Sequence, residues 1–131
     1  MKCFRGCMMA FALVGTATLA NAQDWPQWRG PNRDNKLTGF NVPKEWPKAL
    51  AQKWKVTVGI GESFPAIVGD RFYVFGRQGG DEVTTCLDAM TGKEVWTDKN
   101  PAAAVGWHAK EYQGPRSTIA VAGSLILWTL D

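Results

Sequence analysis

The residue types that most often carry catalysis or bind metals are scarce in this chain. After residue 22 there is one cysteine, Cys86, and one histidine, His108, and their separation matches no zinc-ligand spacing. Ser63 and Ser117 stand outside any Gly-x-Ser-x-Gly sequence, so neither has the pattern of an activated nucleophile. The inventory predicts neither a zinc centre nor a Ser–His hydrolase, and no catalytic residue is assigned.

Arg77 and Arg116 are the two candidates for contact with a cofactor or another ligand. Arg77 follows the aromatic run RFYVF, and Arg116 lies in the sequence GPRST ahead of another apolar run. Where the loops of a sheet protein converge, a guanidinium could hold a carboxylate through paired hydrogen bonds. The alternative is that each arginine donates to loop carbonyls and stabilises the structure. The second role is favoured for both.

The first 22 residues predict an export signal. Lys2 and Arg5 form a short basic head, an apolar run of about 12 residues follows, and Ala20-Asn21-Ala22 supplies a small-x-small cleavage site. The run is shorter than the roughly 20 residues that span a membrane. We therefore expect a mature chain that begins at Gln23, has no membrane span and works in the periplasm or outside the cell.

Removal of this segment changes the charge and the cysteine count. The mature chain keeps 13 Lys and Arg residues against 12 Asp and Glu residues, so its formal charge falls from +3 to +1. A nearly neutral chain gives no reason to expect a nucleic-acid partner. One cysteine remains, so no disulfide within the chain is expected.

Seven tryptophans are many for 131 residues. An indole buries a large area and has one N–H to satisfy, so it suits a wedge between packed layers. A tryptophan-lined groove for a sugar or another ligand is the alternative. The tryptophans stand at the edges of segments and not in one cluster, which favours wedges.

Residues 23–49 predict an irregular lead-in, because they are rich in Pro, Gly, Asn and Trp and have no regular period. Trp25, Trp28 and Trp46 are expected to hold it against the fold. Residues 50–58 then alternate apolar and polar side chains, with Trp54 on the apolar face, and predict a half-buried strand.

Residues 63–97 predict four short antiparallel strands, and no segment has the 3.6-residue period of a helix. The strands are expected at 64–68, 71–75, 82–88 and 94–97, with turns or loops at 69–70, 76–81 and 91–92. The fold class is therefore all-β.

A second copy of this unit begins downstream. The sequence from Ser63 to Gly69 is echoed by the sequence from Ser117 to Gly123, and Trp54 and Trp96 each stand ahead of one copy in similar settings. Repeats of about 40 to 50 residues with four strands each are typical of β-propeller blades. The sequence predicts one complete blade at 63–97 and the start of the next at 115–131; chance similarity of two β segments is the alternative.

The segment CLDAMTGKEVW, from Cys86 to Trp96, resembles the tryptophan-docking repeat of the PQQ-like (quinoprotein alcohol dehydrogenase-like) β-propeller family. The lead-in DWPQWRGPNRDN, and the pair GESFPAIVGDRFYVF and GPRSTIAVAGSLILW, are similar to blade openings of exported bacterial members. The likeness covers roughly residues 24–130. It is specific for the repeat and not for an activity.

The resemblance implies a packing role for the motif. Trp96 would lie between the small residue of its own blade, Cys86, and the glycine turn of a neighbouring blade, and Gly92 offers such a flat turn. From the residues themselves, Gly92 suits a left-handed turn position with a bulge. Asp88 is expected to accept hydrogen bonds from backbone N–H groups of the turn that contains Thr91.

Family members have about seven or eight blades, so the resemblance also implies a longer chain whose remaining blades are the partners of this segment. An open blade leaves edges and faces uncovered. We therefore expect an N-terminal fragment that is not a stable monomer. Trp54 would complete the last blade of a closed ring.

The resemblance implies a non-catalytic binding or scaffold module, secreted or periplasmic. The alternative is a PQQ- and calcium-dependent alcohol or sugar dehydrogenase, and a full-length homologue could bind both cofactors. None of the family's cofactor-binding or catalytic residues can be assigned to positions of this sequence. The fold alone does not decide between these functions.

Overall fold

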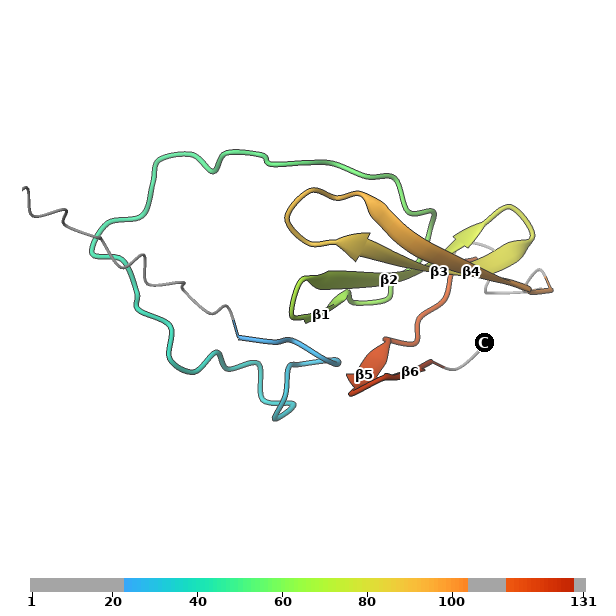
Figure 1. Ribbon diagram of the computed structural model, residues 1–131, viewed down its shortest axis with the longest axis horizontal. Coiled ribbons are helices and arrows are strands. Elements are labelled where there is room, and N and C mark those ends of the chain that lie inside the picture. Colours follow the sequence, from blue (N-terminus) through green and yellow to red (C-terminus); the bar gives the residue numbers. More distant parts are fainter. Residues whose placement is uncertain (1–22, 104–112, 129–131) are drawn as a thin grey trace, which may run out of the picture.

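The computed structural model describes residues 23–103 and 113–128, and the regular elements within them are all β-strands. Four strands form one antiparallel sheet in chain order, and two more form a second sheet (Figure 1). The strands are β1 (Ala66–Val68), β2 (Arg71–Gln78), β3 (Asp81–Asp88), β4 (Glu94–Pro101), β5 (Ala120–Ala122) and β6 (Leu125–Leu127). The all-β prediction is confirmed. The predicted signal, residues 1–22, and His108 lie outside the described residues.

The strands β2, β3 and β4 are longer than predicted. The expected loop at 76–81 belongs to β2 and β3, which pair as far as Gln78 with Asp81 across a turn of Gly79-Gly80. Gly79 has φ +63°, as a two-residue hairpin turn requires. The polar composition of residues 76–81 predicted a loop, but backbone hydrogen bonds between paired strands form whatever the side chains are. For the same reason β4 continues past residue 97 to Pro101.

The turn between β3 and β4 has the predicted form. Gly92 adopts φ +70°, and the register shifts between Cys86, which pairs with Trp96, and Leu87, which pairs with Glu94. The shift is a β-bulge, which sharpens the twist of the hairpin.

The second sheet repeats the first two strands at a constant offset. The step along the chain from Ala66, the start of β1, to Ala120, the start of β5, equals the step from the start of β2 to the start of β6. The turns match as well, because Gly69 and Gly123 have φ +58° and +59°. Replacement of Asp70 by Ser124 therefore leaves the backbone of the turn unchanged.

Residues 50–58 do not form the predicted strand. Only Ile60, just beyond them, pairs with the sheet, through a bridge to Arg77. Alternation shows that one face of a segment is apolar, but it does not supply a neighbouring backbone. The segment runs over the face of the sheet, where a Cβ on Gly76 would lie 2.5 Å from the carbonyl oxygen of Val58.

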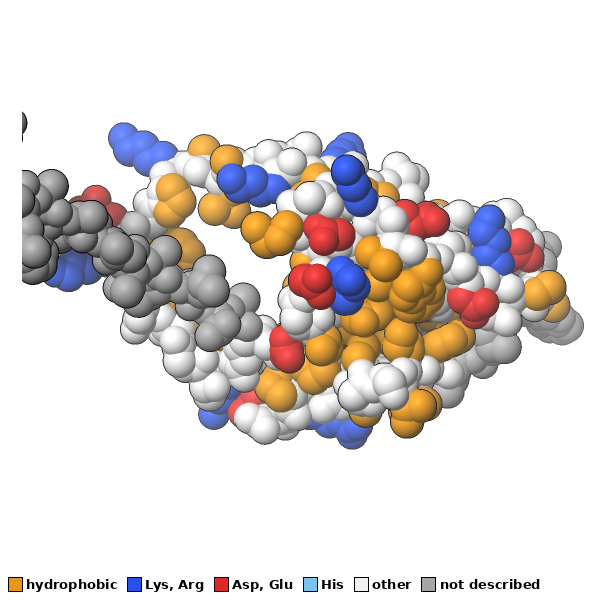
Figure 2. All heavy atoms as spheres, in the orientation of Figure 1, with side chains coloured by type: hydrophobic (Ala, Val, Ile, Leu, Met, Phe, Trp, Pro, Cys, Tyr) orange, Lys and Arg blue, Asp and Glu red, His pale blue; other side chains and the backbone are white. Residues whose placement is uncertain are grey.

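The core lies between the two sheets. Ala66, Phe75 and Ile119 are almost completely buried there. Partly buried side chains pack around them: Tyr73, Val121, Ile126 and Trp128. In Figure 2 hydrophobic side chains gather on the visible face where the two sheets meet.

The lead-in joins both sheets at its start and then leaves them. Trp25 exchanges two backbone hydrogen bonds with Ile67 of β1, and the Pro26 carbonyl accepts one from Val121 of β5. The chain then arches away from the sheets before it returns at Trp54 (Figures 1 and 2). Among the described residues, Trp25 is the one of the three expected tryptophans that holds the lead-in against the sheets. Trp28 is 51% exposed and Trp46 is 65% exposed.

Truncation of Ile119 should loosen the contact between the sheets. Ile119→Ala removes a fully buried side chain and should lower the free energy of unfolding by about 3 kcal/mol, as cavity-forming substitutions do. Hydrogen exchange of the β2 and β3 amides should report that loss as faster opening. Ile60→Ala is the matched control because this side chain is 57% exposed. Equal effects of the two substitutions would contradict the assigned core.

Candidate functional site

The turn that follows β3 is fixed by a set of short hydrogen bonds around one carboxylate. Asp88 Oδ1 accepts from Met90 N at 3.2 Å, Thr91 N at 2.8 Å and Thr91 Oγ1 at 2.7 Å. Gly92 N donates to Asp88 O, and Asp88 N donates to Lys93 O, both at 2.8 Å. The predicted role of Asp88 is confirmed. The turn is a rigid backbone surface with a glycine at its tip.

These hydrogen bonds also stabilise the charged form of the carboxyl group. The pKa of Asp88 is lowered from its ordinary value of 3.8, first by the Thr91 hydroxyl and then by the Thr91 backbone N–H. The guanidinium of Arg71, 4.0 Å from Asp88 Oδ2, adds a smaller effect in the same direction. Asp88 therefore holds the turn as a carboxylate.

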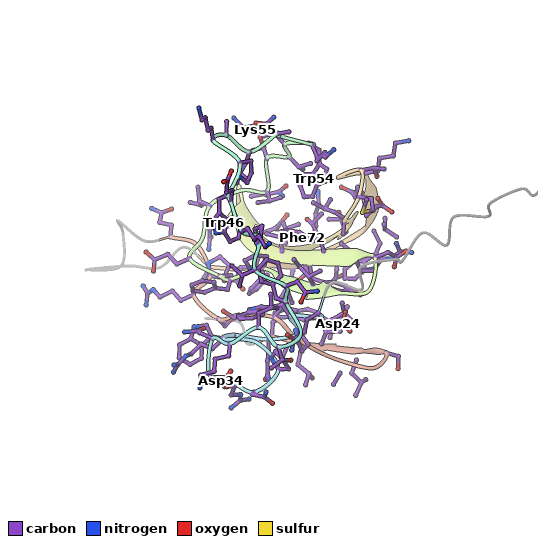
Figure 3. All side chains as sticks on the ribbon, turned by 90° about the vertical axis from the view of Figure 1, so that its left-hand side faces the viewer. Asp24, Asp34, Trp46, Trp54, Lys55 and Phe72 are labelled. Carbon is purple, nitrogen blue, oxygen red and sulfur yellow. The ribbon has the colours of Figure 1, made fainter. Side chains whose placement is uncertain are left out.

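The indole of Trp54 covers this turn from outside the sheet. A Cβ placed on Gly92 would lie 2.7 Å from Cδ2 of Trp54, so the ring lies directly on the glycine. Trp54 Nε1 donates to Ala89 O at 3.0 Å, and the ring meets Phe72 edge-on at 5.7 Å between centroids. In Figure 3 Trp54 lies between Phe72 on the sheet and the segment that carries Lys55. The indole is thus docked by apolar contact and by its one donor.

Trp96 lies on the opposite face of the same sheet. It pairs with Cys86, whose side chain points away from the Trp54 face because neighbouring strand residues alternate. Its ring is half-buried and lies 6.2 Å from that of Tyr73. Cys86 is completely buried, and burial raises the pKa of its thiol. Trp96 and Gly92 therefore belong to two different docking surfaces, and the ring on Gly92 is Trp54.

The two predicted repeat openings lie side by side. Ser63 Oγ is 2.7 Å from Ser117 O and 3.1 Å from Pro115 O. A Cβ on Gly114 would clash with the Cα of Gly61, so the two backbones touch. The serine hydroxyl links equivalent segments and is used as a structural donor.

The two candidate arginines have different surroundings. The guanidinium of Arg77 is buried, and it donates to Ala102 O at 2.8 Å and to Ala103 O at 3.3 Å. These bonds are the structural alternative raised by the sequence. Arg116 is exposed. The structure assigns no common ligand site to the pair.

A hollow in the lead-in is a site that the sequence did not reveal. It measures about 190 Å³ and is lined by Trp25, Trp28, Arg29, Asn35 and Phe64. The guanidinium of Arg29 lies 5.3 Å over the ring of Trp28. Two closely spaced tryptophans, followed by Gly, Pro and Asn, were the only signal in the sequence.

The loop that forms this hollow holds strained backbone. Arg29, Arg33 and Asn35 have φ of 63°, 58° and 60°, a region that residues with a side chain enter at a cost of about 1 to 3 kcal/mol each. The loop is held by Asn35 N bonding to Arg29 O at 3.0 Å and by Gln27 Nε2 bonding to Pro31 O at 3.0 Å. Its shape is therefore defined by its own hydrogen bonds.

A second hollow, of about 250 Å³, lies beside the docked indole. Val56 and Thr57 form one wall, and Thr85, Glu94 and Lys99 stand on the sheet opposite. It marks where the segment after Trp54 leaves part of the sheet face uncovered.

Among residues 23–103 and 113–128 no three His, Cys, Asp or Glu side chains gather in a way that could hold a metal ion. The same described residues include no helix with the length and apolar character needed to cross a membrane. Comparison of the chain with protein-family models, with curated proteins and with solved structures finds no match in any of the three.

A methyl group on Gly92 should displace the indole. Gly92→Ala places a Cβ against Trp54 and strains a backbone at φ +70°, whereas Gly69→Ala strains a backbone at φ +58° with no atom within 4 Å. The two variants should differ in their free energy of unfolding by about 1 to 3 kcal/mol, and this difference isolates the docking contact. Trypsin cleavage after Lys53 and Lys55, which flank Trp54, should then be about tenfold faster in the Gly92 variant. Equal rates would show that the indole does not anchor the segment.

Loss of one donor should raise the pKa of the turn carboxyl group. Thr91→Val removes the hydroxyl that contributes most to the lowered pKa of Asp88, so this pKa should move up toward 3.8. In the unchanged protein the carboxylate stabilises the fold above pH 3.8, and this contribution is lost as pH falls through the lowered value. An NMR titration of the Asp88 carboxyl carbon measures this pKa in the unchanged protein and in the variant. Thr57→Val, at an exposed position, should leave the titration unchanged.

Proposed function

We propose that the chain is part of an exported β-propeller of four-stranded antiparallel blades that acts as a non-catalytic binding or scaffold module. The observation that carries this proposal is the contact of Trp54 with Gly92. An indole supplied from outside the sheet covers the flat backbone of its last turn. The tryptophan-docking repeat that the segment from Cys86 to Trp96 resembles uses a contact of this kind between neighbouring blades.

The opposite face of the sheet supports the same arrangement. Strands β5 and β6, which repeat β1 and β2 at a constant offset along the chain, pack there around Phe75 and Ile119. The sheet thus has a preceding segment on one face and the beginning of a similar unit on the other. Ser63, three residues ahead of β1, bonds to the backbone of its equivalent Ser117, three residues ahead of β5, so the two repeat openings adjoin.

The non-catalytic role is supported by how the reactive residue types are used. Arg77 donates to two loop carbonyls, and Ser63 donates to the backbone of the neighbouring segment. The thiol of Cys86 is buried and has a raised pKa, which makes the thiolate, its reactive form, rare. Each of these groups stabilises the packing of strands.

Uncovered apolar side chains support the presence of further sheets. Leu125 and Leu127 of β6 are 61% and 58% exposed, and Val95 of the edge strand β4 is 46% exposed. Apolar side chains and unpaired strand edges are normally covered by a neighbour. In the proposed ring, further blades of the same kind cover them.

Residues 23–131 produced alone should therefore not behave as an independent domain. We expect self-association in sedimentation velocity and a broad urea transition followed by tryptophan fluorescence, because the uncovered surfaces seek partners. A monodisperse monomer that unfolds in one sharp transition would contradict the proposal.

The absence of catalysis can be tested on the same preparation and on any longer natural form. With PQQ and calcium added, neither should reduce an electron-accepting dye in the presence of simple alcohols or sugars. Dye reduction above that of PQQ and calcium without protein would overturn the non-catalytic role. It would favour the alternative of a PQQ- and calcium-dependent dehydrogenase.

A further inference from the structure

The lead-in hollow lined by Trp25, Trp28, Arg29, Asn35 and Phe64 has the chemistry of a ligand site. We propose that it binds one pyranose ring of a carbohydrate. The proposal deepens the binding role given above and names its ligand class. The hollow is made by residues 25–64, so it does not require the ring of blades.

Aromatic rings form an exposed part of the wall. Trp28 is 51% exposed and Phe64 is 58% exposed, although large apolar rings are usually covered. The face of an aromatic ring carries partial negative charge. The C–H face of a pyranose is apolar and slightly positive, so it stacks on such a ring. The exposed rings therefore suit a sugar better than an anion.

Two polar groups reach the same hollow. Within the described part of the chain, neither the guanidinium of Arg29 nor the side-chain amide of Asn35 forms a hydrogen bond or an ion pair. Together they offer several N–H donors and one carbonyl acceptor. Sugar hydroxyl groups both donate and accept, so they match this combination. The guanidinium of Arg29 lies over the Trp28 ring, 5.3 Å from its centroid, so the donors and the aromatic surface are held together.

The loop holds these groups in place before any ligand arrives. Three residues that carry side chains, Arg29, Arg33 and Asn35, keep positive φ values, and such strain gathers at functional sites. Trp25 is fixed by its bridge to Ile67 and lies beneath Gly30, where a Cβ would come within 2.9 Å of the ring. A site that is already ordered loses less entropy on binding.

The size of the hollow sets the size of the ligand. At about 190 Å³ it is smaller than the roughly 300 to 1,000 Å³ of pockets that enclose drug-sized molecules. It suits one sugar ring with neighbouring rings outside. We therefore expect weak binding of a monosaccharide and tighter binding of an oligosaccharide.

The proposal is tested by titrating the full chain with cellohexaose, laminarihexaose and xylohexaose. At least one should bind with a Kd of about 1 mM or tighter, measured by calorimetry, and should shift the indole N–H resonances of Trp25 and Trp28. Trp28→Ala should weaken this binding about tenfold, and Arg29→Ala should weaken it several-fold. Trp46→Ala is the matched control, because it removes an exposed tryptophan that stacks on Phe40 elsewhere in the lead-in.

Three results would overturn the proposal. The first is no binding of any hexasaccharide at about 10 mM, which is above the expected Kd. The second is equal weakening by Trp28→Ala and Trp46→Ala. The third is tighter binding of a proline-rich peptide, another ligand of aromatic-lined grooves, that displaces the sugar from the hollow. Gly92→Ala should leave sugar binding unchanged, so failure here is distinguishable from failure of the proposed ring.

Discussion

The indole of Trp54 can lie flat on the chain only where no side chain intervenes, and Gly92 provides that place. The same glycine holds the left-handed conformation that the turn needs, with φ +70°. The Asp88 carboxylate fixes the turn through Thr91, so the surface under the ring is already shaped. Turn geometry, carboxylate charge and docking therefore meet at one turn.

This contact gives the four-stranded sheet two covered faces. Phe72 and Leu87 point to the side of Trp54, while Ala66 and Phe75 point to the side of β5 and β6. A sheet with one wet face would alternate apolar and polar residues, but every residue of β3 from Glu82 to Leu87 is buried. The central strand therefore requires material on both sides. That requirement, more than any single motif, supports the proposed ring of repeated sheets.

The sequence predicted what depends on neighbours along the chain. The turn at 88–92 follows from Asp, Thr and Gly at fixed spacing, and the strands of the sheet follow from their composition. It failed where the outcome depends on distant backbone. Residues 50–58 alternate like a strand but pair with no strand in the described part of the chain. Residues 76–81 look like a loop but are paired. The lead-in hollow was missed because positive φ at Arg29 and Arg33 has no signature in the residue types.

The lead-in gains its precision from the sheets that it joins. Backbone hydrogen bonds tie Trp25 to β1, and one from Val121 of β5 ties the next residue, Pro26. The strained loop begins directly after this anchor, so its rings and polar groups are held on a fixed base. Within residues 23–103 and 113–128 the later arch has no such backbone anchor before Trp54, and its Trp46 stacks on Phe40. The strained loop and the later arch therefore differ, although both belong to the lead-in. The loop is held by both sheets and can present side chains in a defined arrangement, and the arch is not held in this way.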